Sequence, residues 1–182
     1  MNNFKTEAIV LKAIKFAEAD RLLTVFSRHY GRVKVLAKGI RKVTSRKGAS
    51  LELFNRTKLV LAKGRNLDII TEVEVLDAYR NWRQDLVRVG VAYYLVELVE
   101  RLIPEGEENR RVYRLLVNSL ENLSQARIGD LIRRFEEEML TDSGFGIPEN
   151  YRDNAASLSA YIEEIIERNL KSKDILKLIK YA

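Results

Sequence analysis

Polar and apolar residues alternate along the first 80 positions of the chain, and many of the apolar ones are β-branched. A period of two is typical of strands that bury one face. Short breaks at Tyr30-Gly31 and Gly64-Arg65 predict hairpins that pair the second strand with the third and the fourth with the fifth. The pattern predicts five strands, at residues 4–16, 21–30, 32–40, 57–64 and 66–76.

One long connection interrupts these strands, from Arg41 to Arg56 between the third and the fourth. It leaves room for one or two helical turns around residues 49–54. Five strands with an insertion between the third and fourth are the arrangement of an OB-fold, a barrel that commonly binds oligonucleotides.

From Arg80 onward the apolar residues recur with a period of about 3.6, which is typical of helices. The pattern predicts helices at residues 80–103, 109–123, 128–143, 156–170 and 172–181. Pro104 and Gly106 would end the first helix, and Ser172 would cap the last. We therefore predict an α+β chain, with a five-stranded OB-fold β-barrel that binds nucleic acid at residues 1–79 and an all-α helical domain at residues 80–182.

Positive charge is concentrated in the first part of the chain. Residues 1–80 hold 17 Lys or Arg and 8 Asp or Glu, whereas residues 81–182 hold 15 and 18. No acidic residue lies between Asp20 and Glu52. An anionic polymer is the expected partner, because a basic surface gains affinity by releasing counterions from phosphates.

The strongest candidate for this surface is the stretch from Gly31 to Ser50. Alternation places Val33, Val35 and Ala37 on one strand face and basic residues on the other, and the strand continues into a basic loop. The seven candidate contacts are Arg32, Lys34, Lys38, Arg41, Lys42, Arg46 and Lys47. If about five phosphates were neutralised, the slope of log K against log salt would be roughly −3.5 on single strands.

Single-strand-binding proteins also stack bases on aromatic side chains. Phe26, Tyr30 and Phe54 are the nearby candidates, although each is also a candidate for the core. A basic strand face that is merely solvated is the alternative interpretation of the whole stretch.

Other chemistry has little support in the composition. The chain has no cysteine and one histidine, which excludes thiol nucleophiles, disulfides and cysteine zinc sites. Glu136, Glu137 and Glu138 follow one another on a predicted helix, about 100° apart, so they would form a solvated face rather than a convergent site. We expect no catalytic residue, no metal, no cofactor and no enzymatic activity. The longest apolar run, residues 89–96, is far too short to span a membrane, and we expect a cytoplasmic protein without a membrane partner.

Three segments together resemble the bacterial recombination mediator family RecO. They are EADRLLTVFSRHYGRVKVLAKGIRKVTSRKGASLELF (18–54), YYLVELVERLIPE (93–105) and RRFEEEMLTDSGFGIPE (133–149). The resemblance implies an OB-fold followed by a helical domain, binding of single- and double-stranded DNA, and annealing of complementary strands. It also implies the partner RecR, work on DNA coated with single-strand binding protein so that RecA can load, and association with the nucleoid.

The chain departs from this family pattern in two ways. Many members place a four-cysteine zinc motif after the Gly-x-Gly-Ile-Pro segment, where this chain reads ENYRDNAASLS. It also ends at Ala182, earlier than is usual in the family. The resemblance is therefore to a short form without the zinc motif.

The helical part holds a second candidate site, for a protein partner. Family members bind the acidic, Phe-ended tail of single-strand binding protein on this domain, and an apolar pocket with a basic rim suits such a tail. The candidates are Arg127, Arg133, Arg134 and Phe135, the alternative being that Phe135 belongs to the core and the arginines are solvated. Two other functions also fit the charge and the fold: an OB-fold protein that binds RNA, and a docking module for acidic protein partners.

Overall fold

The computed structural model describes residues 3–40, 48–151 and 155–174, with the side chains of 155–157 left out. The first part contains five strands and a single 3-10 turn. They are β1 (Asn3–Phe16), β2 (Asp20–Ser27), β3 (Gly31–Ala37), η1 (Ala49–Leu51), β4 (Arg56–Ala62) and β5 (Asp68–Asp77). The predicted five strands and the predicted turn after the basic loop are therefore confirmed.

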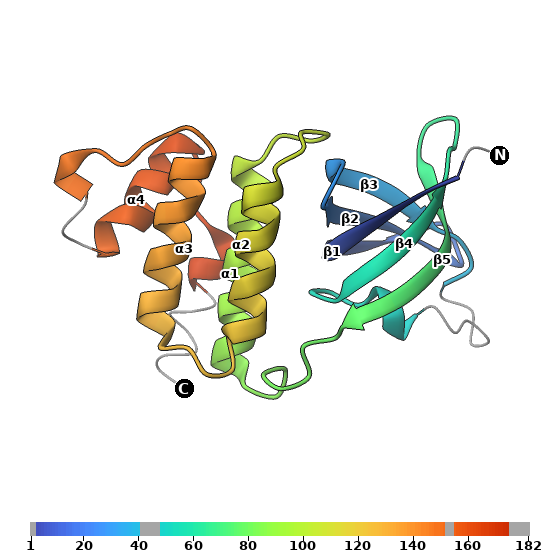
Figure 1. Cartoon of the computed structure of the whole chain (residues 1–182), viewed down its shortest axis with the longest axis horizontal. Helices are drawn as coiled ribbons and strands as arrows, with labels where there is room; N and C mark the ends of the chain where they lie inside the picture. The colour runs from blue at the N-terminus through green and yellow to red at the C-terminus, as the bar shows by residue number, and fades with distance from the viewer. Residues whose placement is uncertain (1–2, 41–47, 152–154, 175–182) are drawn as a thin grey trace. The chain divides into compact units, whose positions relative to one another are not determined.

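The five strands close into a barrel in the order β1-β2-β3-β5-β4 (Figure 1). β2 pairs with β3 and β4 with β5 in antiparallel hairpins, as predicted. Alternate side chains fill the barrel, among them Leu23, Val25, Val35 and Leu59, none of which is exposed to solvent. The α+β class with an OB-fold-like first part is thus confirmed.

Register shifts in two strand pairs and one short parallel junction shape the barrel. The register between β1 and β2 shifts between Val10 and Lys12, which marks a bulge at Leu11. Among the described strands, β3 and β5 are the only parallel neighbours, and two residue pairs join them, Val35 with Asp68 and Leu36 with Ile69. The other four strand pairs each register seven or eight residues.

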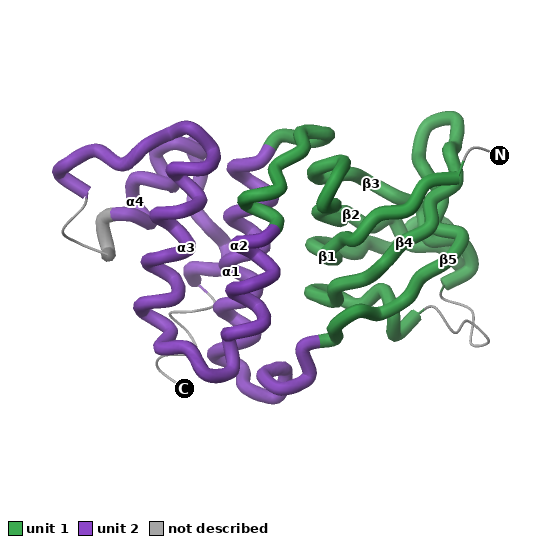
Figure 2. The backbone as a smooth tube through the Cα atoms, viewed as in Figure 1, with its two compact units in different colours: residues 1–78, 104–113 green, residues 79–103, 114–182 purple. Residues whose placement is uncertain are grey.

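Contacts divide the chain into two compact units (Figure 2). Unit 1 contains the barrel residues 1–78 together with residues 104–113, and unit 2 contains residues 79–103 and 114–182. The segment after the first long helix is therefore part of the barrel unit. The division of function at residue 79, expected from the sequence, stays a prediction.

The first helix, α1 (Leu86–Leu102), is shorter than the predicted 80–103. Its N-cap is Asp85, whose carboxylate accepts hydrogen bonds from the backbone N–H groups of Val87 and Arg88. Residues 80–84 form turns instead, and Tyr79, just before them, has a φ of +50°. Trp82, which the sequence pattern assigned to the helical stripe, lies in these turns and donates its buried indole N–H to the Leu120 carbonyl oxygen at 2.9 Å.

The remaining helices largely follow the pattern. α2 (Arg110–Asn122) and α3 (Ile128–Asp142) agree with their predicted ranges within one residue at each end. η2 (Glu149–Tyr151) precedes α4 (Ala155–Ile165), which ends earlier than the predicted residue 170 because the chain turns at Glu167, where φ is +51°.

The last predicted helix is described only at residues 171–174, which are helical. The expectation that Ser172 caps this helix is wrong. The carboxylate of Glu97, on α1, accepts hydrogen bonds from the backbone N–H groups of Lys171 and Ser172 and from the Ser172 hydroxyl. An acid from a neighbouring helix thus fills the place of the local cap.

Candidate nucleic-acid interface

An apolar band crosses the outside of the barrel from β1 to β5. Strand register places Ile14 beside Leu22, Leu22 beside Leu36, and Leu36 beside Ile69. Their neighbours Leu23, Val35 and Ile70 point into the core, so alternation directs the band outward. Ile14 is 46% exposed and Phe16, two residues further along β1, is 44% exposed. Exposed apolar side chains gathered on a sheet are typical of an interaction surface.

Basic side chains lie on both sides of this band. Lys12, Thr24 and Lys34 form the next outward row on one side, and Lys38 follows the end of β3 on the other. Lys12, Lys34 and Lys38 are exposed, and Arg32 is half-buried. The predicted alternation along β3 is confirmed, with Val35 and Ala37 in the core. The role of these residues in DNA binding stays a prediction.

The outer face of β2 and β3 is covered near the β2–β3 turn, away from the apolar band, by residues 104–113 of the same unit. The Phe26 ring, which is fully buried, packs on Tyr113 with 5.9 Å between ring centroids. The backbone N–H of Gly106 donates to the Arg32 carbonyl oxygen at 2.8 Å, and Lys34 Nζ lies 2.9 Å from Glu105 Oε2. This end of the face is therefore covered around Phe26, whereas Lys34 remains exposed to solvent.

The aromatic candidates are corrected by this arrangement. Phe26 is fully buried and Phe54 is 3% exposed, so neither can stack on a base, and both serve the interior. Tyr30 is exposed, and its ring makes an edge contact with Phe4 at 4.8 Å. Phe16 was missed, although its position at the end of a long alternating strand, in phase with Ile14, was a signal for an outward aromatic ring.

A hydrogen bond to a side chain holds the backbone just after β3. Asp20 Oδ1, at the start of β2, accepts a hydrogen bond of 2.7 Å from the backbone N–H of Gly39, where φ is +65°. The hydrogen bond holds the chain just after the end of β3 beside the turn between β1 and β2. The predicted contacts Arg41, Lys42, Arg46 and Lys47 lie outside the described residues.

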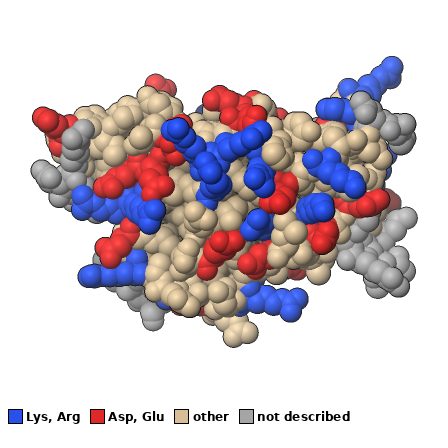
Figure 3. Space-filling view, viewed as in Figure 1, with Lys and Arg blue, Asp and Glu red and all other residues tan. Residues whose placement is uncertain are grey.

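Charges of both signs are mixed on the face shown in Figure 3, where Lys and Arg side chains lie among Asp and Glu side chains. On the barrel, Glu7 contacts both Arg28 and Arg56, and Lys63 pairs with Asp68. The net positive charge of the first part is thus partly offset within the unit that carries it.

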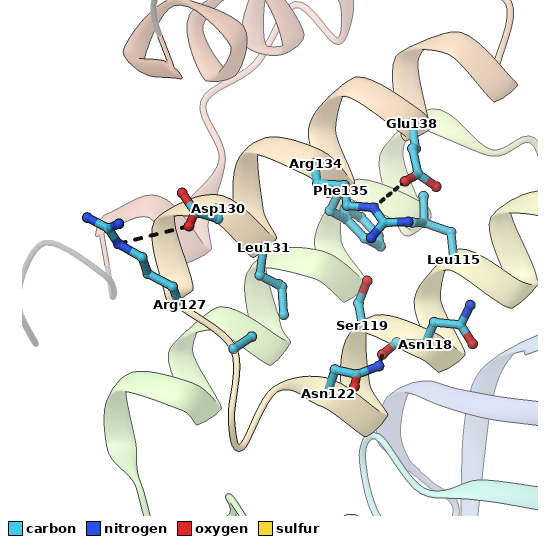
Figure 4. Close-up of a pocket in the computed structure, with 11 residues that line it drawn as sticks. Leu115, Asn118, Ser119, Asn122, Arg127, Asp130, Leu131, Arg134, Phe135 and Glu138 are labelled. Atoms are coloured by element: carbon cyan, nitrogen blue, oxygen red, sulfur yellow. Dashed lines mark hydrogen bonds and ion pairs between the residues drawn. The ribbon is translucent and has the colours of Figure 1, made fainter.

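A pocket of about 380 Å³ lies between α2 and α3 in unit 2 (Figure 4). Phe135, which is fully buried, and Leu131 line it from α3, and Leu115 lines it from α2. Arg134 and Glu138 lie at one end and Arg127 and Asp130 at the other. The pocket therefore has an apolar base and a charged rim.

Three of the four predicted partner-binding residues meet in this pocket: Arg127, Arg134 and Phe135. Arg133 does not line it and pairs with Glu137 at 2.9 Å. Arg134 Nε lies 2.6 Å from Glu138 Oε1, and Arg127 Nε lies 3.9 Å from Asp130 Oδ2. Phe135 belongs to the core and to the pocket lining at once.

The three consecutive glutamates do diverge, but the expected solvated face is wrong for one of them. Glu136 is 2% exposed and accepts a hydrogen bond from the Tyr94 hydroxyl on α1. Burial raises the pKa of Glu136 to about 7, against the lowering effects of the Tyr94 hydrogen bond and the charge of Lys173. Burial also raises the pKa of Tyr94. A carboxyl group that holds its proton up to about neutral pH therefore joins α1 to α3.

Within residues 3–40, 48–151 and 155–174, no helix is both long enough and apolar enough to cross a bilayer. In the same ranges no three His, Asp or Glu side chains gather as a metal site would need.

Comparisons with known proteins give matches over both units. Residues 1–79 match the family model "Recombination protein O N terminal" and residues 83–152 match "Recombination protein O C terminal". A DNA repair protein RecO from Roseiflexus sp. (strain RS-1) is 40% identical over 166 residues, which are 91% of this chain and 57% of the relative. A protein of the same name from Geobacter metallireducens is 36% identical over 169 residues, 92% of this chain and 68% of the relative.

A third relative, from Pelotomaculum thermopropionicum, is 39% identical over 145 residues, 80% of this chain and 57% of the relative. The chain thus spans a little over half the length of several curated relatives that it matches. The order of the two matched segments follows the order of the two folded parts, a β-barrel and then helices. On this evidence the chain belongs to the RecO family.

Proposed function

We propose that this chain acts in DNA repair as a recombination mediator without catalytic activity, and that its barrel binds DNA. The observation that carries the proposal is the outward apolar band with Phe16 at its end, bordered by Lys12 and Lys38. A surface of this kind supplies what a single strand requires, namely rings and apolar side chains for the bases and ammonium groups for the phosphates. Relatives named DNA repair proteins support the choice of DNA.

The DNA contacts on this surface come from the strand and from the loop that follows it. The proposed set is Arg32, Lys34, Lys38, Arg41, Lys42, Arg46 and Lys47. Contacts to phosphates are independent of sequence, so the same surface serves single and double strands and brings complementary strands together for annealing.

The helical unit provides the protein-binding part of the proposal. The pocket between α2 and α3 joins apolar side chains to the guanidinium groups of Arg127 and Arg134. A peptide that ends in a Phe ring and an α-carboxylate, with acidic residues before it, has the complementary chemistry. Single-strand binding protein carries such a tail, and with RecR as second partner the chain would help RecA to load in the cytoplasm.

Annealing of two complementary fluorescent oligonucleotides, as DNA and as RNA, tests the function. The wild type is compared with a variant in which Arg41, Lys42, Arg46 and Lys47 are changed to Glu. We expect the wild type to accelerate DNA annealing and the variant to lose the acceleration. Equal action on RNA would instead support the RNA-binding function. No binding of either nucleic acid at low salt would leave the basic stretch as a docking surface for acidic proteins.

A further inference from the structure

An acidic side chain of the same unit, Glu105, pairs with one of the lysines that we propose bind nucleic acid. Residues 104–113 lie along the edge of this face, and the chain at Glu105 forms a parallel bridge to Arg32. The Glu105 carboxylate reaches over the face to Lys34, whose Nζ lies 2.9 Å from Oε2. The ion pair therefore occupies one of the ammonium groups that border the apolar band.

The position of Glu105 is fixed by backbone contacts rather than by its side chain. The Gly106 N–H donates to the Arg32 carbonyl oxygen at 2.8 Å, and the Glu107 backbone lies against Gly31. The segment is thus held in place whether or not Lys34 is bound to Glu105. The carboxylate stays within reach of Lys34 at a high local concentration.

The ion pair itself is weak enough to be exchanged. The side chains of Lys34 and Glu105 are 46% and 48% exposed, so water and salt screen their attraction. A phosphate can approach the same ammonium group from solvent. Among the described residues, no such acidic partner is available to Lys38, which is also exposed.

We infer that Glu105 competes with the nucleic-acid backbone for Lys34 and so limits the affinity of the barrel for its ligand. The inference rests on the proposed function, since it concerns the regulation of the same surface. A nucleic-acid strand must displace the Glu105 carboxylate before one of its phosphates can bind Lys34. The nucleic acid therefore dissociates more readily from the barrel, which a protein that exchanges DNA strands requires.

The test measures binding of a fluorescent single-stranded oligonucleotide by anisotropy across a salt series. Glu105→Gln removes the competitor and keeps the shape of the side chain. Glu107→Gln is the matched control, because it makes the same charge change in the same segment and Glu107 has no ion pair with Lys34. We expect Glu105→Gln to raise the affinity about threefold or more above Glu107→Gln, with a salt slope steeper by about 0.7.

The double variant Lys34→Gln/Glu105→Gln assigns the gain to the pair. We expect it to bind no more tightly than Lys34→Gln alone. A gain that persists without Lys34, or that Glu107→Gln reproduces, would overturn the inference, because long-range charge would then account for it.

A comparison that leaves Glu105 intact gives a second test. Lys34→Gln should weaken wild-type binding less than Lys38→Gln, since Lys34 is already neutralised; an equal or larger loss counts against the inference. Absence of salt-dependent binding by the wild type would instead reject the proposed function together with the inference. Circular dichroism verifies that each variant is folded.

Discussion

Gly31 lies directly against the backbone of Glu107. A Cβ atom at Gly31 would come within 1.9 Å of the Glu107 carbonyl oxygen, and the φ of Gly31 is +64°. Glycine is therefore required at the start of β3 for two separate reasons, the left-handed backbone and the close approach. The close approach follows from the way residues 104–113 cover one end of the β2–β3 face, and the left-handed backbone lies where the β2–β3 turn enters β3.

This contact predicts a large loss of stability for Gly31→Ala. The left-handed backbone alone costs about 1–2 kcal/mol with a side chain, and the overlap with Glu107 adds about 1–3 kcal/mol. Gly106→Ala is the matched control, since Gly106 has a φ of +80° but open space where its Cβ atom would lie. Urea denaturation should show a clearly larger loss for Gly31→Ala, and equal losses would contradict the close packing.

Glu136 predicts that stability depends on pH. Its pKa is about 7 in the folded chain against an ordinary value of 4.5, so between these values the folded state holds a proton that the unfolded chain releases. Stability is fully present below pH 4.5 and falls as pH rises through about 7, by up to about 3 kcal/mol.

Glu136→Gln should remove this dependence, because the amide stays neutral and can still accept from the Tyr94 hydroxyl. In denaturation experiments, Glu136→Gln and the wild type should be about equally stable at pH 5. At pH 8 the variant should be the more stable of the two. Glu138→Gln, a neutral substitution two residues further along α3 at a carboxylate that pairs with Arg134, should keep the wild-type profile. A Glu136→Gln profile that matches the wild type would show that this carboxyl is already ionised when folded.

Phe16 predicts an aromatic contribution to nucleic-acid binding. Loss of one stacked base costs about 1–3 kcal/mol, so Phe16→Ala should weaken binding of a single strand roughly 5- to 150-fold. Phe145→Ala is the control, because Phe145 is 45% exposed but belongs to unit 2. Fluorescence anisotropy at low salt measures both, and an unchanged affinity for Phe16→Ala would exclude this ring from the interface.

The pocket between α2 and α3 predicts a difference between two adjacent arginines. Arg134 lines the pocket and Arg133 does not, although each pairs with the glutamate four residues later. Arg134→Glu should weaken binding of an acidic peptide that ends in Phe by about tenfold or more, since it reverses the charge that we propose contacts the peptide carboxylate. Arg133→Glu should change the affinity much less, and similar losses in titration calorimetry would remove the pocket as the peptide site.

Sequence periodicity predicted the barrel well because strands such as β4 bury alternate side chains, although β2 is buried on both faces from Leu23 to Ser27. Val35 and Ala37 point inward as the pattern required, and the Tyr30-Gly31 break does form a hairpin. The pattern could not predict where α1 begins, because Trp82 fits the helical stripe while the Asp85 cap starts the helix later.

The sequence pattern also could not predict contacts between residues that are far apart in the chain. Nothing local to Phe26 shows that Tyr113 covers it, and nothing local to Lys34 shows that Glu105 neutralises it. The same holds for Glu136, whose burial depends on α1 as well as on its own helix. Side-chain type and spacing suggested the candidate surface, but long-range packing decides which part of it is open.

The two-pair seam between β3 and β5 has a consequence for how the barrel opens and closes. With so few pairs across it, this seam should separate more readily than any other strand junction, and its amide protons should exchange with solvent early. Leu36 and Ile69, which face each other across the seam, also belong to the apolar band. A nucleic-acid strand bound over both side chains would hold β3 and β5 together. Nucleic-acid binding and closure of the barrel should therefore stabilise each other.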